Sequence, residues 1–211
     1  MCGDKMGKMI DNSIVDFTAE LASSAAVPGG GGASALAGAL GIALGSMAGS
    51  ISASAKKPAL YELNKESEAL RAELLSLIDE DAKNFAPLSK AYAKPKTDPD
   101  YAETMRSATI QACSSPIAIM RCCCKAIELL ENTRALCSKL LLSDIACGAS
   151  ICRAALESAS FNVFVNTKSL SDADASPLNA EADAMLSEYL PRAQKISDDI
   201  KNTLRGCDNN G

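Results

Sequence analysis

The chain has 211 residues and carries 21 Lys and Arg against 26 Asp and Glu, which gives a net charge of −5 at neutral pH. Its length suits one domain, and an acidic chain without a run of Lys or Arg is not expected to bind nucleic acid. The chain contains no histidine. Any proton transfer must therefore use Asp, Glu, Lys, Tyr, Cys or water.

Composition also indicates the fold class and the compartment. Aromatic residues make up only 4% of the chain and Trp is absent, whereas the strong helix formers Ala and Leu are abundant. We therefore expect a single all-α domain, a multi-helix up-and-down bundle. Residues 1–12 contain no apolar segment typical of a signal peptide. Together with nine cysteines, this favours a reducing, cytoplasmic location and no membrane partner.

The expected helices follow in chain order. Ser13 can cap a first helix. The apolar stripe of that helix comprises Ile14, Val15, Phe17, Leu21 and Ala22. Further helices are expected at about 33–54, from Pro58 to near Pro95, from Asp98–Pro99 onward, at about 135–167, and from Ser176–Pro177 to Leu204. The domain core then covers about 13–204, with flexible ends at 1–12 and 205–211.

A glycine-rich segment, Pro28 to Gly32, leads into the second helix at Ala33–Ser34. The backbone amides of such a segment, with the helix N-terminus, can hold an anion or a planar polar group. The segment lacks the Lys-Ser/Thr ending of a phosphate-binding loop and follows no expected strand, which argues against a nucleotide site. A plain turn is the alternative interpretation.

The second helix carries small residues at every fourth position. These are Ala33, Ala37, Gly41, Gly45 and Gly49. They form a groove that another backbone can approach closely. Because no charged residue occurs between Glu20 and Lys56, a membrane span must also be considered. The 33–54 segment has only six large apolar residues beside five serines and four glycines, which favours a buried helix of a soluble protein.

Asp81 is the most informative residue of the third helix. At 100° per residue it shares a face with apolar side chains. They are Leu70, Leu74, Leu77, Ile78, Phe85 and Leu88. A carboxylate in such a stripe needs a partner or a raised pKa. It can serve a functional site, or it can form a structural ion pair or hydrogen bond with a neighbouring helix.

Asp144 presents the same problem further along the chain. If the helix is continuous, Asp144 shares a face with Cys137, Leu140 and Gly148, and Asn162 follows 18 residues later, five full turns. Asn166 lies one turn beyond. Alternatively, Ser143 caps a new helix and Asp144 lies in its first turn, where the helix dipole favours a carboxylate.

The run Cys122-Cys123-Cys124 invites a metal interpretation. Three consecutive helical residues spread over about 200° and cannot all ligate one ion. We expect Cys123 to fill the core, the other two to be partly exposed, and no metal to bind.

Several of these segments together resemble the cyclodeaminase/cyclohydrolase family. This family includes the C-terminal domain of formiminotransferase-cyclodeaminase and stand-alone methenyltetrahydrofolate cyclohydrolases. The matching segments, in the family's order, are Asp16-Phe17, Val27 to Leu40, Asp81 to Phe85 with Tyr92 and Pro95-Lys96, Ser143-Asp144, and Asn162 to Asn166. One departure is Gly32, a fourth glycine where the family continues into Ser or Ala.

The resemblance implies a helical-bundle homodimer that acts on a tetrahydrofolate derivative without a metal or redox cofactor. It favours Asp81 and Asp144 as catalytic candidates. The substrate-binding candidates are Pro28, Gly29, Gly30, Gly31, Gly32, Ser34, Asn162 and Asn166. A buried Asp81 can stabilise the cationic methenyl bridge and take a proton from water, while Asp144 and Asn162 can orient that water or the pterin amide.

The favoured activity is hydrolysis of 5,10-methenyltetrahydrofolate to 10-formyltetrahydrofolate, because 211 residues leave no room for a formimino-transfer domain. One alternative is formiminotetrahydrofolate cyclodeaminase, an ammonia lyase. A non-catalytic folate-binding or scaffold protein is the alternative of another class.

Overall fold

The structure is a computed structural model that describes residues 8–206, and this part of the chain forms helices and no strand. The elements are η1 (Met9–Asp11), α1 (Ile14–Leu21), α2 (Gly30–Ser52), α3 (Ala59–Ala91), α4 (Tyr101–Leu136), η2 (Lys139–Leu141), α5 (Leu142–Thr167) and α6 (Asp172–Leu204). The predicted all-α fold is confirmed.

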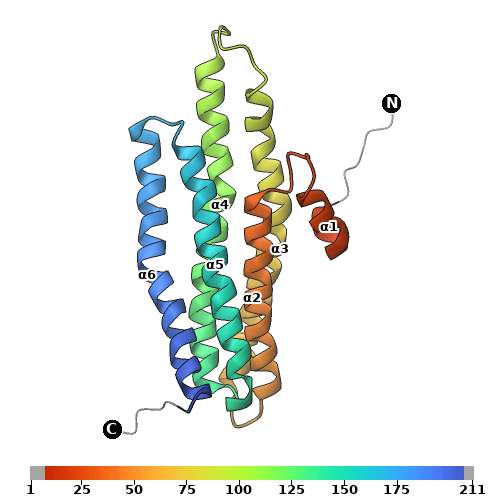
Figure 1. The fold of residues 1–211 in the computed structure, drawn as a ribbon, viewed down its shortest axis with the longest axis vertical. Coiled ribbons are helices and arrows are strands. Elements are labelled where there is room, and N and C mark those ends of the chain that lie inside the picture. The colour runs from red at the N-terminus through yellow and green to blue at the C-terminus, as the bar shows by residue number, and fades with distance from the viewer. Residues whose placement is uncertain (1–7, 207–211) are drawn as a thin grey trace.

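The helices α2 to α6 run alternately down and up the long axis of the molecule (Figure 1). Short connections join their ends, so each helix is antiparallel to the next, as predicted for an up-and-down bundle. The helix α4 packs against α2, α3, α5 and α6 and supplies the centre of the core. The largest fully buried side chains include Ile42, Leu74, Leu88, Met120, Ile127, Leu130 and Leu156.

Four predicted helix boundaries are wrong. The helix α3 ends at Ala91 rather than near Pro95. The helix α2 begins at Gly30 rather than near Ala33, so the glycines form its first turn instead of a loop. The expected 135–167 helix is interrupted at 137–141, because α4 ends at Leu136 and α5 begins at Leu142. The helix α6 begins at Asp172, where acidic residues in the first turn favour a start before Pro177.

The helix α1 lies beside the bundle rather than in it (Figure 1). Ser13 caps it as predicted, since its Oγ accepts the Asp16 N–H at 3.1 Å. Of the expected apolar stripe only Phe17 is buried, whereas Ile14 and Val15 are 76% and 75% exposed. The short helix is held by one anchoring ring, and the prediction that its whole stripe faces the core is wrong.

Residues 8–12, part of the end expected to be flexible, include η1, which packs on α3, and the Met9 N–H donates to Asp79 Oδ1 at 2.7 Å. The outer parts of the two ends expected to be flexible, residues 1–7 and 207–211, lie outside the described residues.

The helix α2 is long and apolar enough to cross a membrane by length and composition, but it packs against α3, α4 and α5 as a core helix. Its small residues serve this packing. A Cβ on Gly41 would meet Cys152 Sγ and lie 3.0 Å from the Gly148 carbonyl oxygen, and a Cβ on Gly45 would lie 2.7 Å from Leu130. The groove is therefore filled by the chain's own helices and cannot motivate a homodimer.

Candidate functional site

The N-terminal turn of α2 lies against polar side chains from two other helices. A Cβ on Gly31 would overlap the Asp81 carboxylate of α3, and a Cβ on Gly30 would lie 2.9 Å from Asn162 Oδ1 of α5. A larger residue at either position would displace these polar groups. Gly32 differs, since a Cβ there would make ordinary contacts with Pro28 and Ile78 at 3.5 and 3.7 Å.

Asp81 has an unusual electrostatic setting. Burial raises the pKa of its carboxyl group to about 6, opposed by the hydrogen bond that the Gly32 N–H donates. Among residues 8–206 no cation forms an ion pair with Asp81. The structural ion pair considered for this residue is therefore not present in the described chain. A carboxyl group with a pKa near 6 exchanges its proton readily close to neutral pH.

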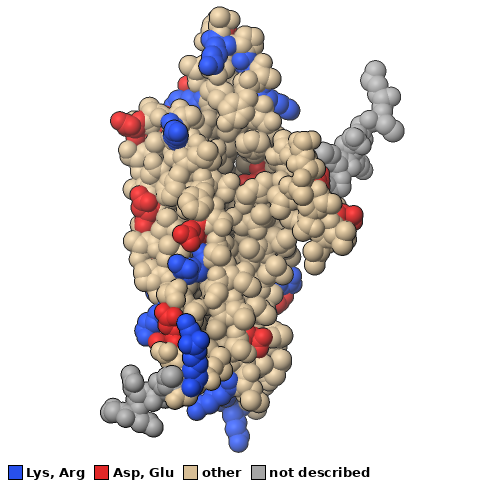
Figure 2. Space-filling view, in the orientation of Figure 1, with Lys and Arg blue, Asp and Glu red and all other residues tan. Residues whose placement is uncertain are grey.

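These groups line a cavity of about 190 Å³. Figure 2 shows the surface hollowed beside the upper end of α2, with an acidic side chain inside the hollow. The lining residues are Ala26, Val27, Gly29, Gly30, Gly31, Asp81, Phe85, Ala112, Pro116, Asn162, Val165 and Asn166. Apolar walls thus surround one carboxyl group, two side-chain amides and a helix N-terminus, which is the composition of a small-molecule site.

The two asparagines lie one turn apart on α5. The Asn162 Nδ2 donates to the Ser158 carbonyl oxygen at 3.0 Å, which orients the amide and directs its Oδ1 toward Gly30. The N–H groups of the first turn of α2 have no acceptor within the helix, and the one on Gly32 binds Asp81. The cavity therefore offers amide donors, an amide acceptor and a titratable carboxyl group within one small volume.

The profile of a family described as formiminotransferase-cyclodeaminase matches residues 13–200. The chain belongs to this family. It is 34% identical over 205 residues to methenyltetrahydrofolate cyclohydrolase of Methylorubrum extorquens, with 92% of this chain and 98% of that protein covered. It is 29% identical over 174 residues to formimidoyltransferase-cyclodeaminase of Mus musculus, where the match covers 78% of this chain but only 32% of the mouse protein.

A solved structure shares the fold. Formiminotetrahydrofolate cyclodeaminase of Thermotoga maritima superposes with a TM-score of 0.78 at 24% sequence identity, covering 93% of this chain and 98% of that one. The bundle described above is thus also the fold of that solved protein.

The structure brings most of the predicted site residues together in the cavity, namely Asp81, Gly29, Gly30, Gly31, Asn162 and Asn166. The other three predicted binding residues, Pro28, Gly32 and Ser34, do not line the cavity. Pro28 is buried, Gly32 contributes its N–H, and Ser34 Oγ donates to the Gly30 carbonyl oxygen at 2.6 Å. Ser34 thus supports the first turn of α2 and does not line the cavity.

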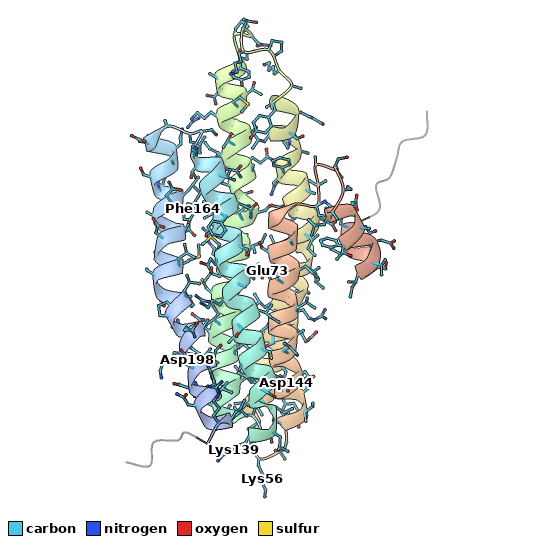
Figure 3. The ribbon with its side chains drawn as sticks, viewed as in Figure 1. Lys56, Glu73, Lys139, Asp144, Phe164 and Asp198 are labelled. Atoms are coloured by element: carbon cyan, nitrogen blue, oxygen red, sulfur yellow. The ribbon has the colours of Figure 1, made fainter. Side chains whose placement is uncertain are left out.

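Asp144 lies away from this cavity. It is in the first turn of α5, at the opposite end of the bundle (Figure 3). At 1.5 Å per residue, Asn162 is about 27 Å further along the helix. The break at 137–141 explains the position, as the alternative interpretation anticipated, although α5 is capped by Leu141 and not by Ser143. The structure does not support pairing Asp144 with Asp81 in one site.

The apolar lining was not predicted as part of the site. Phe85 and Val27 both border the cavity, but helical periodicity assigns Phe85 to the core stripe, and Val27 precedes the glycines without a distinguishing feature. Only their position around Asp81 identifies them.

The cysteines fill the interior. Cys122, Cys123 and Cys124 are all buried, so the expectation that two of them are partly exposed is wrong. Burial raises the pKa of the Cys122 and Cys124 thiols to about 12, which keeps them protonated. Within residues 8–206 no group of three His, Cys, Asp or Glu side chains is arranged to hold a metal ion.

Proposed function

We propose that this protein is a methenyltetrahydrofolate cyclohydrolase that adds water to 5,10-methenyltetrahydrofolate and releases 10-formyltetrahydrofolate and a proton. The observation that carries the proposal is Asp81, a half-buried carboxyl group without a cationic partner among residues 8–206, whose pKa is raised to about 6 beside the glycine turn of α2. The relative from Methylorubrum extorquens, covered over 98% of its length, supports this reaction.

The geometry suggests how the chain can promote this hydrolysis. The substrate bridge carries a delocalised positive charge and can pair with an ionised Asp81, which has no cationic partner among residues 8–206. The same carboxylate takes the proton of the attacking water. Asn162 Oδ1 can accept a hydrogen bond from that water, and the first-turn amides of α2 can donate to a pterin oxygen.

Cyclodeamination of formiminotetrahydrofolate is the second candidate. It expels ammonia and therefore needs a proton donor for the leaving amine. Asp81 is also suited to this step, because a carboxyl group with a pKa of about 6 retains a protonated fraction near neutral pH. The named activities of the mouse relative and of the Thermotoga maritima structure favour it.

One experiment separates these reactions and tests the non-catalytic alternative. The pure protein is incubated separately with methenyltetrahydrofolate and with formiminotetrahydrofolate, and the absorbance change and products are followed. We expect rapid conversion of the first substrate to 10-formyltetrahydrofolate. Ammonia release from the second alone would assign the cyclodeaminase, and binding without turnover of either would show a folate-binding protein.

We further propose that the protein is a cytoplasmic homodimer without a metal or redox cofactor. The free thiols of all seven described cysteines suit a reducing compartment. The dimer would form through α2 and α5, because the face over these helices carries few charges (Figure 2). Its exposed apolar side chains are Leu40, Met47, Ile51, Phe161 and Val165. Light scattering at micromolar concentration should give twice the 21.9 kDa chain mass, and a monomer would contradict the dimer.

A further inference from the structure

A second, larger cavity adjoins the one that contains Asp81. It has a volume of about 710 Å³ and lies among η1, α1, the segment before Pro28, and α3. The two cavities share Ala26, Val27 and Phe85 in their walls. The helix α3 contributes to both cavities. Asp81 lines the first, Phe85 lines both, and Lys83 and Lys90 line the second.

The first cavity is too small for a whole folate. Pockets that hold ligands of this size have volumes of roughly 300–1,000 Å³, whereas the Asp81 cavity has about 190 Å³. It can take the part of the molecule that reacts. The p-aminobenzoyl-glutamate part must then extend past Val27 or Phe85, and the second cavity is the adjoining space.

The second cavity is basic in an acidic protein. Its wall includes Lys8, Lys83 and Lys90 against two carboxylates, in a chain of net charge −5. Both carboxylates already accept hydrogen bonds, Asp79 from the Met9 N–H at 2.7 Å and Glu20 from Asn12 Nδ2 at 3.3 Å. Among residues 8–206, no hydrogen bond or ion pair engages the side-chain ammonium group of Lys83 or Lys90.

The two lysines are also suitably spaced. Seven residues separate them, so they lie on one face of α3, about 10 Å apart along the axis. Flexible ammonium groups at this spacing can close on the two carboxylates of a glutamate residue from both sides. Phe85, which borders both cavities, offers an apolar surface to the benzoyl ring.

We propose that the glutamate tail of the folate substrate binds in this second cavity, with its carboxylates held by Lys83 and Lys90; this rests on the proposed function. The site would distinguish folates that carry glutamate from otherwise identical pteroates. It contributes to binding and takes no part in the reaction at Asp81.

The test compares 5,10-methenyltetrahydrofolate with 5,10-methenyltetrahydropteroate, which lacks the glutamate. The variant carries Lys83→Gln and Lys90→Gln, and the control is Lys65→Gln, an exposed lysine of the same helix that borders neither cavity. For each protein, KM and kcat are measured by absorbance and Kd by equilibrium titration. Added salt should weaken the parent protein's binding of the folate more than its binding of the pteroate, which lacks the two glutamate carboxylates.

We expect the double variant to raise KM and Kd for the folate about ten-fold, with kcat within two-fold of the parent. Its values for the pteroate, and all values of the Lys65→Gln control, should not change. Equal changes for folate and pteroate, or none for either, would overturn the tail site. A parent protein that binds the folate through these lysines without converting it would refute the proposed reaction and keep the tail site.

Discussion

At the scale of single residues, Asp81 shows how burial sets up chemistry. Its neighbours along α3, Leu77, Ile78 and Leu88, are buried, so the carboxyl group is forced into a setting that disfavours its charge. The Gly32 N–H offsets only part of that cost, and the pKa remains at about 6. The chain thus obtains a group that can exchange protons near neutral pH without using histidine.

Replacement of Asp81 tests this role directly. Asp81→Asn keeps the shape but removes both the negative charge and the base, so turnover should fall by at least about 10²–10⁴-fold. Stability should hold or rise at pH 7, because no described cation loses a partner. Glu80→Gln, a neighbouring exposed carboxylate, is the control and should keep normal turnover. Near-normal turnover in a markedly destabilised Asp81→Asn protein would show that Asp81 serves the fold.

The pH dependence of stability gives a second test. The pKa of Asp81 is raised from 3.8 to about 6 on folding, so the folded state binds more protons than the unfolded state within this interval. Its free energy of unfolding should therefore decrease as pH rises from about 4 to about 6, by up to about 3 kcal/mol in total. Urea titrations at pH 4, 5, 6 and 7 should show this loss in the parent relative to Asp81→Asn. Parallel curves for the two proteins would contradict it.

At the scale of elements, the N-terminal turn of α2 determines the geometry of the site. It replaces the expected loop, and its glycines let α3 and α5 bring polar groups against helical backbone. The family has Ser or Ala where this chain has Gly32. The structure accommodates either, because position 32 has room for a Cβ whereas positions 30 and 31 do not.

Alanine substitutions should separate these positions. Gly31→Ala places a Cβ on the Asp81 carboxylate and must displace it. We expect a loss of kcat of about 100-fold, the scale that a misplacement of about 1 Å can cause. Gly32→Ala retains the N–H that binds Asp81 and meets only ordinary contacts, so it should lose far less. Steady-state kinetics measures kcat for both variants. Equal losses of kcat would contradict this role of the turn and indicate a flexible connection.

The contact between α2 and α5 provides a matching test of stability. A Cβ on Gly148 would lie 2.7 Å from the Gly41 carbonyl oxygen, so Gly148→Ala should push the two backbones apart and cost about 1–3 kcal/mol. Cys147→Ala, an exposed change on the adjacent residue, should alter stability by less than about 0.5 kcal/mol. Denaturant unfolding measures both, and a neutral Gly148→Ala would show that the helices can separate freely.

At the scale of the whole molecule, the protein concentrates its polar chemistry at one end of an apolar bundle. Five of the seven cysteines among residues 8–206 are buried, and burial raises the pKa of the Cys123 and Cys152 thiols. The candidate site relies on oxygen and amide groups. We therefore expect turnover to be unchanged after dialysis against EDTA, measured by the same absorbance assay. Activity lost on chelation and restored by zinc would overturn the proposal of a metal-free reaction.

The sequence by itself determined the all-α class, the Ser13 cap, the apolar stripe around Asp81 and the small-residue face of α2, because each depends on local propensity or on helical periodicity. The same local patterns placed the start of α2 three residues late, and the family resemblance favoured Asp144 as a catalytic partner of Asp81. Only the tertiary structure decided which residues meet: the break at 137–141 set the start of α5, and the packing of α2 between α3 and α5 brought Gly31, Asp81 and Asn162 together. Distances between helices depend on connections and on side-chain volumes across the whole core, and periodicity within one helix contains neither.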